Sequence, residues 1–350
     1  MQTKLRVKID DSPLNSGHAL RGMGFYMRNL VDSIKESKKV ELSDNDYDII
    51  HYPYFDLFAN TLHIIDGKKT VVTIPDLIPL MYPKIYKPGF KGRKSFAKQL
   101  KALKKVDAII TISETSKKDI VRLLKIPAEK IYVTYLGPGN KHSKTKMHLD
   151  LPDDYILYVG DVNWNKNIVS FIKAVNKANL NLVIVGKHAR DILESKLDTP
   201  VHGPRDVLRT MFGQIHPEVK HFRELQQLLR NSKNVTTLGY VEDEEFAAVY
   251  QQATIYCQPS FYEGFGLPLL EAMEAKLPIA ASKTQALVEI AGDAALYFDP
   301  YSIQDMSDKL RMLIENKKMQ QELVSKGSGR VKYFSWDFTA EETIKVYENL

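Results

Sequence analysis

Short apolar runs that predict buried strands alternate with longer helix-like segments along most of the chain. This alternation is typical of parallel sheets, because parallel neighbours need a long crossover connection that is usually a helix. It occurs in two series, which a looser polar run at residues 137–150 separates. The sequence therefore predicts an α/β protein with two doubly wound, Rossmann-like domains.

The length of 350 residues supports this division, because a single core rarely grows beyond about 250–300 residues. We expect an N-terminal domain at 1–140, a C-terminal domain at 141–332 and a last helix at 333–350, capped by Ser335 or Asp337. In the first series we expect strands near 4–9, 48–53, 70–74, 107–112 and 131–134 and helices near 20–36, 90–105 and 114–125. In the second series we expect strands at 155–161, 181–186, 235–239, 254–259, 278–281 and 294–298.

The composition narrows the class of protein. An apolar fraction of 44% and a charged fraction of 26% are ordinary for a soluble globular chain. One cysteine, Cys257, excludes an internal disulfide and a cysteine-based metal cluster. No run approaches ~18 apolar residues and the first residues lack the apolar core of a signal peptide, so we expect a cytoplasmic protein. The net charge of +6 favours anionic ligands.

Residues 259–275 carry the strongest functional signal. They follow a short β-rich run, Ala253 to Pro259, and contain a Gly-Phe-Gly turn before an apolar helix. A strand, a glycine turn and a helix direct free backbone N–H groups at an anion. Two carboxylates, Glu263 and Glu271, lie eight positions apart around this turn. A phosphate at the N–H groups would leave Glu271 to accept from sugar or ribose hydroxyls, which suits a nucleotide-sugar.

The segment belongs to a longer set of motifs. Pro-Ser-Phe-Tyr-Glu-Gly-Phe-Gly-Leu-Pro-Leu-Leu-Glu-Ala-Met (259–273) is preceded by Leu-Gly-Tyr-Val-Glu-Asp-Glu-Glu (238–245) and followed by Ala-Gly-Asp-Ala-Ala-Leu-Tyr-Phe-Asp-Pro (291–300). Further matches are at 155–160, 165–167, 182–186, 76–80, 110–116 and 127–131. With these motifs the chain resembles the retaining glycosyltransferases of family 4. The resemblance implies the GT-B fold, in which two Rossmann-like domains face each other across a cleft and a C-terminal helix crosses back to the first domain.

The resemblance also implies roles for residues. Glu271 would bind the two ribose hydroxyls of the donor, and Glu263 would contact the transferred sugar. Lys166 would neutralise the leaving diphosphate. The backbone of the glycine turn would meet the sugar or diphosphate, and two residues after another strand would flank the base. The implied donor-binding set is Asn165, Lys166, Tyr240, Val241, Gly264, Phe265, Gly266, Leu267 and Glu271, with Glu263 and Lys166 as catalytic residues.

Two positions depart from the family pattern. The family usually has Arg-Lys at the diphosphate, whereas this chain has Asn165-Lys166, so one cation is lost. The family often has a histidine before the Asp-Leu of the first domain, whereas Pro75 precedes Asp76 here. Proline offers no side-chain hydrogen bond. Transfer with retention does not strictly need that histidine, because the leaving phosphate can accept the acceptor's proton.

Other candidates for sugar or acceptor contact lie in the first half: Gly22, Gly24, His51, Tyr54 and Asp76. Gly22 and Gly24 open a helix after the first strand, where a packing turn is an equal alternative. For His51 and Tyr54, at a strand end, an acceptor contact and a structural role are both open. No His, Asp or Glu cluster has the spacing of metal ligands, so we expect no tightly bound metal and no cofactor. The role of the long connection at 187–216 is not readable from sequence.

Residues 84–105 contain nine Lys or Arg and no acidic residue. Phe96, Leu100 and Leu103 have helical spacing, with lysines on the other faces. One interpretation is a surface that docks on anionic lipid, as suits a lipid-linked acceptor. The alternative is an ordinary helix that packs its apolar stripe on the sheet. No recognition motif accompanies the charge, so we do not expect nucleic acid as a partner.

The resulting hypothesis is a retaining, metal-independent hexosyltransferase that uses a nucleotide diphosphate sugar, GDP-mannose first and a UDP-sugar second. The acceptor would be a glycan or a lipid-linked sugar. One rival is a non-catalytic sugar-nucleotide-binding protein or scaffold of the same fold, which Pro75 and Asn165 make plausible. A phosphorylase is a weaker rival, because no lysine context for pyridoxal phosphate is recognisable.

Overall fold

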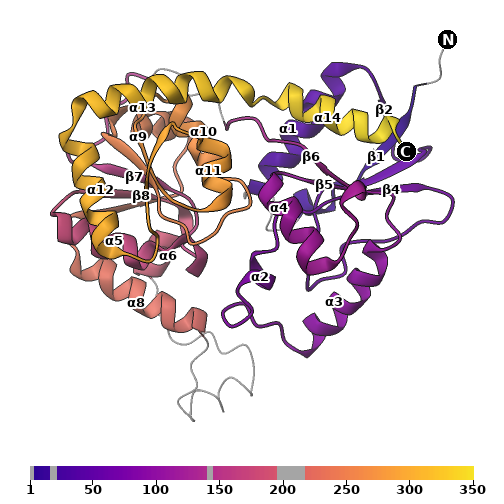
Figure 1. Ribbon diagram of the computed structural model, residues 1–350, viewed down its shortest axis with the longest axis horizontal. Helices are drawn as coiled ribbons and strands as arrows, with labels where there is room; N and C mark the ends of the chain where they lie inside the picture. The colour runs from indigo at the N-terminus through magenta and orange to yellow at the C-terminus, as the bar shows by residue number, and fades with distance from the viewer. Residues whose placement is uncertain (1–3, 16–21, 140–144, 195–216) are drawn as a thin grey trace. The chain divides into compact units, whose positions relative to one another are not determined.

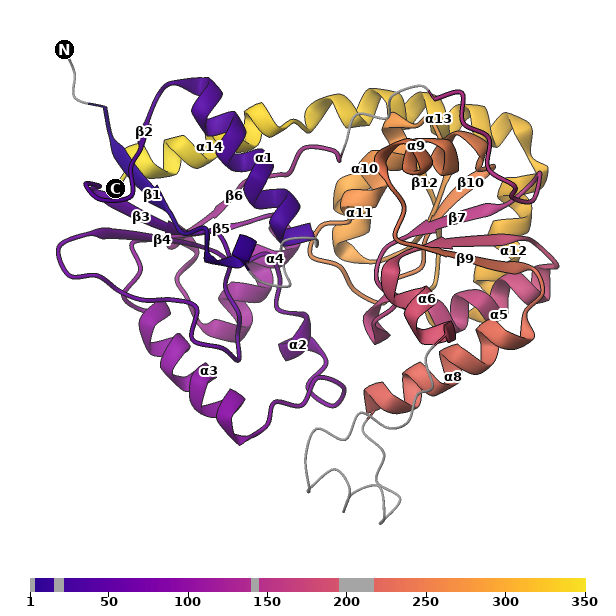
Figure 2. The ribbon, with the colours of Figure 1, turned by 180° about the vertical axis from the view of Figure 1, so that it is seen from behind.

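The computed structural model describes residues 4–15, 22–139, 145–194 and 217–350 (Figures 1 and 2). The chain divides into two compact units. The N-terminal unit comprises Met1–Met81, Lys87–Pro138 and Lys332–Leu350. The C-terminal unit comprises Tyr82–Tyr86 and Gly139–Val331. The chain therefore enters the second unit briefly at Tyr82–Tyr86, which the sequence did not predict.

In its described residues, the N-terminal unit has one parallel sheet of six strands in the order β2-β1-β3-β4-β5-β6. The central strands are buried on both faces, which explains why they are mostly apolar or β-branched in the sequence. The strands are β1 (Arg6–Ile9), β2 (Glu41–Leu42), β3 (Ile49–Tyr52), β4 (Lys69–Thr73), β5 (Ala108–Thr111) and β6 (Ile131–Val133), and the helices are α1 (Gly22–Ser37), α2 (Ile78–Met81), α3 (Phe90–Leu103), α4 (Glu114–Asp119) and α14 (Trp336–Glu348).

Three details of this unit differ from the sequence prediction, and one of them is the short helix α2, which was not predicted. Strand β2 was not predicted, because its two residues are too few to show a periodicity. The helix expected at 114–125 ends as α4 at Asp119 and continues as a π-helical turn over Ile120–Leu124, which closes at Lys125 with a left-handed backbone.

In the described part of the C-terminal unit, six parallel strands have the order β12-β11-β10-β7-β8-β9. Counted from β7, this is the Rossmann order 3-2-1-4-5-6. The strands are β7 (Ile156–Val159), β8 (Leu182–Val185), β9 (Val235–Gly239), β10 (Ile255–Gln258), β11 (Ile279–Ser282) and β12 (Ala295–Phe298), and the helices are α5 (Ile168–Ala178), α6 (Lys187–Glu194), α8 (Pro217–Asn231), α9 (Asp243–Gln252), α10 (Leu267–Glu274), α11 (Gln285–Ala291), α12 (Ile303–Glu315) and α13 (Lys317–Arg330).

The core of this unit shows why α5 lies where it does. Its buried residues Ile168, Phe171, Ile172 and Val175 recur at helical spacing and form one apolar stripe. This stripe packs with α12 and α8 against the sheet. The helix is thereby held with its N-terminus beside the loop that follows β7.

Helix α14 belongs to the N-terminal unit, where it packs against α1 (Figures 1 and 2). Ser335 caps it by accepting from Phe338 N at 3.1 Å, and Trp336 donates to the Pro138 carbonyl at 2.8 Å. Of the described helices, none combines the length and the apolar character needed to cross a membrane.

Candidate functional site

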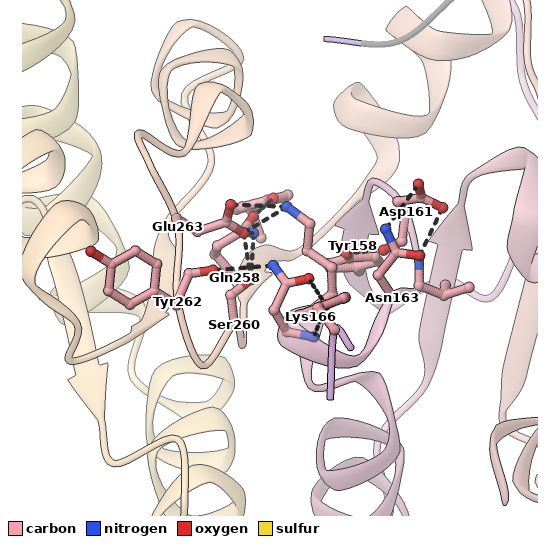
Figure 3. Close-up of polar contacts among 12 residues, drawn as sticks. Tyr158, Asp161, Asn163, Lys166, Gln258, Ser260, Tyr262 and Glu263 are labelled. Atoms are coloured by element: carbon pink, nitrogen blue, oxygen red, sulfur yellow. Dashed lines mark hydrogen bonds and ion pairs between the residues drawn. The ribbon is translucent and has the colours of Figure 1, made fainter. Parts of the chain in front are cut away.

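The strand order of the C-terminal unit creates a site between β7 and β10. These neighbours lead to connections on opposite sides of the sheet, which leaves a crevice at their carboxyl ends where ligands bind in such folds. The loop after β7 contains a short turn at Trp164–Lys166, and the loop after β10 runs through Ser260 to the glycine turn. Figure 3 shows that polar side chains from both loops converge here.

Lys166 and Glu263 are paired across this point. The Lys166 Nζ donates to both carboxylate oxygens of Glu263, at 2.8 and 2.9 Å, although the residues are 97 positions apart (Figure 3). The Glu263 side chain is 8% exposed and that of Lys166 is 23% exposed. A buried carboxylate such as Glu263 requires an ionic or hydrogen-bonding partner, and its partner Lys166 is more accessible than Glu263 itself. The arrangement fixes one ammonium group at the open side of the site.

Two further groups hold Glu263. Gln258 donates from Nε2 to Oε1 of Glu263 at 2.8 Å, and the hydroxyl of Ser260 donates to the same oxygen at 2.6 Å. The Gln258 amide is itself oriented, because the hydroxyl of Tyr256 donates to its oxygen. Sequence reasoning missed Gln258 and Ser260. The available signal was a polar residue at the end of an otherwise apolar strand.

The glycine turn has the geometry that its sequence predicts. Gly266 has a φ of +100° and immediately precedes α10, and Pro268 lies in the first turn of that helix. A side chain at position 266 would be strained, and its Cβ would also lie 2.8 Å from Leu287. Phe265 is buried, Gly264 precedes it, and Leu267 begins the helix. The turn thus presents backbone between Glu263 and the N-terminus of α10.

Glu271 lies on α10 in a confined position. Its Oε2 accepts from the Tyr250 hydroxyl at 2.9 Å. Its Oε1 lies so close to Gly139 that a Cβ on that glycine would be 2.1 Å away. Burial raises the pKa of Glu271 to about 7, and Glu274 adds to the rise. Tyr250 and Gly139 were not predicted as site residues, since neither carries a recognisable motif.

The two glutamates are joined by buried side chains. Tyr250, which contacts Glu271, is stacked with Tyr256 at a centroid distance of 6.3 Å and an interplanar angle of 12°. Tyr256 holds Gln258, and Gln258 holds Glu263. A packed network of buried side chains therefore connects Glu263 with Glu271, and it holds both carboxylates in fixed positions.

Asn165 is buried and bonded within the protein. Its Nδ2 donates to the Tyr262 carbonyl at 3.2 Å, and its Oδ1 accepts from the Tyr86 hydroxyl at 2.8 Å. Its backbone carbonyl accepts from Phe261 N at 2.8 Å. Asn165 thus connects the loop after β7 to the loop after β10. Of the two residues Asn165 and Lys166, only Lys166 carries a charge.

Tyr240 and Val241 lie at the same edge of the sheet but farther away. They follow β9, which is separated from β10 by β8 and β7. Tyr240 is 63% exposed, and Val241 is half-buried. Tyr240 therefore presents an exposed aromatic ring at this edge of the sheet. Of residues 187–216, only α6 lies within the described residues.

The candidate residues of the N-terminal unit with polar side chains, His51, Tyr54 and Asp76, form hydrogen bonds with other residues of the same unit. His51 is fully buried, with its ring nitrogens 2.6 Å from the Tyr347 hydroxyl and 2.8 Å from the Thr73 hydroxyl, and burial lowers its pKa to about 3. Its structural interpretation is the one that the geometry favours. Tyr54 donates to Asp56 at 3.3 Å, and Asp76 accepts from Ile78 N at the start of α2. Gly22 is exposed at the start of α1, and Gly24 is buried.

A Rossmann-ordered sheet with a cation, two fixed carboxylates and a glycine turn at its switch point is typical of α/β proteins that bind a ligand at the carboxyl ends of their strands. The family model of the glycosyl transferases group 1 matches residues 140–330, and that of Glycosyltransferase Family 4 matches residues 9–137. The chain belongs to the glycosyl transferases group 1 family.

The chain is also similar in sequence to proteins that are named mannosyltransferases. The chain is 26% identical over 292 residues to an O-antigen chain mannosyltransferase B of Escherichia coli, a match that covers 81% of this chain and 71% of the relative. It is 26% identical to an MMP alpha-(1->4)-mannosyltransferase of Mycolicibacterium hassiacum, over 71% of this chain and 56% of the relative. It is also similar to the serotype-specific mannosyltransferase WbdA of Escherichia coli, of which it spans only 34%.

Solved structures establish the fold. A sucrose-phosphate synthase from Thermosynechococcus elongatus superposes with a TM-score of 0.72 at 16% identity, with 99% of both chains covered. WaaG, a glycosyltransferase involved in lipopolysaccharide biosynthesis, gives a TM-score of 0.63 at 11% identity, with 98% of this chain and 99% of WaaG covered. The chain has the GT-B fold that its motifs predict.

Proposed function

We propose that the protein is a retaining hexosyltransferase that moves a sugar, mannose first, from a nucleotide diphosphate donor to a hydroxyl of a glycan or lipid-linked acceptor. The observation that carries this proposal is the Lys166–Glu263 pair at the switch point, flanked by the glycine turn and Glu271. These groups supply a cation from the loop after β7, backbone N–H donors and one carboxylate from the loop after β10, and a second carboxylate from α10.

In the proposed mechanism each group acts on one part of the donor. Lys166 stabilises the negative charge that develops on the diphosphate as the glycosidic bond breaks, and such stabilisation is usually the largest catalytic contribution. The N–H groups of the glycine turn and the start of α10 bind the diphosphate or sugar. Glu263 accepts from a hydroxyl of the transferred sugar, and Glu271 accepts from both ribose hydroxyls. Tyr240 and Val241 flank the base.

Retention follows if the acceptor hydroxyl attacks from the face that the diphosphate leaves. The leaving phosphate oxygen then takes the acceptor's proton, and the protein needs no separate base. Pro75 is compatible with this route, because the route needs no side-chain base at that position. We propose that no metal takes part. In the described ranges, no three His, Cys, Asp or Glu side chains are placed to share a metal ion.

The choice of donor rests on the relatives. Mannose is favoured because several are named mannosyltransferases. A UDP-sugar is the second choice, because the structurally similar Anabaena Alr3699/HepE was solved with UDP and glucose, at a TM-score of 0.72 and 13% identity over 99% of this chain and 100% of that one. The chain spans only part of several relatives, so their acceptors do not define its own.

A thermal-shift panel with GDP, UDP, ADP and their sugar conjugates tests the donor assignment. A donor at 100 times its Kd stabilises the folded protein by about 2.7 kcal/mol. We expect one nucleotide family to raise the Tm by several degrees and the others to leave it unchanged. No response to any of them would contradict the proposal. Stabilisation without any consumption of a conjugate would favour the rival, a sugar-nucleotide-binding scaffold.

We expect donor affinity to rise with pH through about 7. Ribose hydroxyls donate to the ionised form of Glu271, whose pKa burial raises from 4.5 to about 7. The dissociation constant of the nucleotide-sugar should therefore fall about tenfold between pH 6 and pH 8. Calorimetry with GDP-mannose or UDP-glucose measures this, since a diphosphate diester does not titrate in the window. A Glu271→Gln variant should give a flat profile, and a flat wild-type profile would contradict the role of Glu271.

The same carboxyl has an opposite effect on stability. The folded protein holds its proton more tightly than the unfolded chain does. Its contribution to the free energy of unfolding is therefore present below about pH 4.5 and is lost as the pH rises through about 7.

We propose that residues 84–105 contact an anionic membrane surface. Their apolar stripe packs into the core through Phe96, Leu100 and Leu103, as an ordinary helix would. However, Phe90 at the start of α3 is 81% exposed and lies among exposed lysines. An exposed aromatic ring beside cations suits a lipid interface. Pelleting with vesicles that contain phosphatidylglycerol should be salt-sensitive and should weaken in Phe90→Ser; binding equal to that of neutral vesicles would contradict the proposal.

A further inference from the structure

A hollow of about 300 Å³ lies in the C-terminal unit beside the proposed donor site. It is lined by the starts of α5 and α8, by the two loops that carry Lys166 and Glu263, and by Ile85 of the Tyr82–Tyr86 segment. The residues that matter for its chemistry are Trp164, Ser170, Lys220, His221, Glu224 and Phe261. The volume is at the lower end of the range for small-molecule sites.

One wall of the hollow is aromatic and held in place. The rings of Trp164 and Phe261 lie 4.8 Å apart at 30°. Tyr301 stacks on Phe261 at 5.0 Å, and Tyr82 packs edge-on against Trp164 at 5.0 Å. The negative face of an aromatic ring attracts weakly positive C–H groups, such as those on the apolar face of a pyranose. Phe261 lies between Trp164 and Tyr301, so a sugar would pack its C–H groups against the aromatic surface of Trp164 and Phe261 that still lines the hollow.

His221, another residue that lines the hollow, supplies a neutral hydrogen-bond acceptor. His221 is 7% exposed, and its Nε2 donates to the Val162 carbonyl at 2.9 Å. Burial lowers the pKa of His221, so the ring is neutral and Nδ1 is left as an acceptor. Within the described ranges, no group hydrogen-bonds this Nδ1. A ligand hydroxyl would satisfy it.

The rim adds both donors and acceptors. Glu224 accepts from Lys173 through Oε1 at 2.6 Å, which leaves Oε2 for a ligand. Lys220 is exposed and Ser170 is half-buried, and both line the hollow. A mixture of a paired carboxylate, an ammonium, a hydroxyl and a neutral imidazole suits several hydroxyl groups better than one strong charge. Together with the aromatic wall, this is the chemistry of a carbohydrate site.

We propose that this hollow binds a neutral sugar residue of the acceptor glycan, a step that rests on the proposed transferase function. Trp164 lies two positions before Lys166, and Phe261 lies two positions before Glu263. A sugar bound here is thus held by the same loops that hold the donor. The site increases affinity for a glycan acceptor and takes no part in the bond-breaking step.

Tryptophan fluorescence tests the proposal without an activity assay. The chain has two tryptophans, Trp164 and Trp336, so a Trp336→Phe protein reports from the hollow alone. We would titrate it with α-mannotriose, maltotriose and chitotriose in the absence of donor. A saturable change in Trp164 emission is expected for at least one. Adding Ser170→Phe, which fills the hollow, should weaken that response at least tenfold.

Lys177→Phe is the matched control, because Lys177 lies two turns farther along α5, is exposed and does not line the hollow. It should leave the response unchanged. A response to decanol in place of all three sugars would contradict the proposal, as would a sugar response that survives Ser170→Phe.

A control with nucleotides distinguishes failure of the proposed glycan site from failure of the proposed transferase function. If GDP or UDP raises the Tm of the Trp336→Phe protein but none of the sugars changes its emission, the glycan site is overturned while the donor site stands. If no nucleotide raises the Tm, the proposed transferase function fails whatever the sugars do.

Discussion

Replacing Lys166 with alanine is expected to lower kcat for sugar transfer by about 10²- to 10³-fold. The ammonium group is fixed 2.8 and 2.9 Å from the two oxygens of Glu263 and is 23% exposed, so it meets a ligand without reorganising. Loss of one such preorganised group at a developing negative charge has this magnitude in other enzymes. Release of nucleoside diphosphate in a coupled assay at saturating donor measures the effect.

The fold should survive this substitution. Glu263 keeps its bonds from Gln258 and Ser260, so the cost in the free energy of unfolding should be about 1–3 kcal/mol. Lys177→Ala, an exposed lysine on α5, is the control and should retain wild-type rates. A folded Lys166→Ala protein with a kcat within twofold of wild type would remove Lys166 from the mechanism.

Glu271→Ala should weaken binding of the donor nucleotide about 100-fold. The carboxylate is proposed to accept two ribose hydroxyls, and hydrogen bonds to a charged group contribute about 1.5–3 kcal/mol each before compensation. A net loss of about 2.7 kcal/mol corresponds to the expected factor. Calorimetric titration at pH 8, where Glu271 is mostly ionised, gives the dissociation constant directly.

The thermal stability of Glu271→Ala should not fall with its donor affinity. At pH 8 the ionised Glu271 is destabilising, because burial raises its pKa to about 7. Its removal should not lower the Tm and can raise it, as is common where a binding site is held at a cost in stability. Glu274→Ala is the control: it removes a charge that raises the pKa of Glu271, so donor affinity should be kept or improved. Unchanged donor affinity in Glu271→Ala would rule out ribose binding by this residue.

The sequence predicted much of the fold because the strands of a doubly covered parallel sheet are buried on both faces. Strands such as β8, Leu182–Val185, are continuous apolar runs bounded by turn residues, and these can be located without homologues. Strand β2 was missed, because two residues show no pattern. The passage of Tyr82–Tyr86 into the C-terminal unit was also missed, since it depends on a tyrosine hydroxyl that bonds Asn165 79 positions away.

The site was predictable where chemistry and local geometry coincide. The glycine turn before α10 has a positive φ at Gly266, and the two glutamates flank it within one short segment. The partners of those glutamates were not predictable. Gln258 contacts Glu263 in an orientation that the Tyr256 hydroxyl fixes, and Gly139 is a site residue because its backbone lies against Glu271. Such contacts arise from tertiary packing and leave no spacing in the sequence.

A proton NMR time course tests the central claim most directly. The wild-type protein is incubated with GDP-mannose or UDP-glucose and the three trisaccharides, and the anomeric signals of donor and products are followed. We predict that one α-linked donor is consumed, that a new α-anomeric product signal grows in equal measure, and that Lys166→Ala slows both changes by about 10²- to 10³-fold. A wild-type protein that binds the nucleotide yet leaves every donor signal intact, or that yields a β-linked product, would contradict the account.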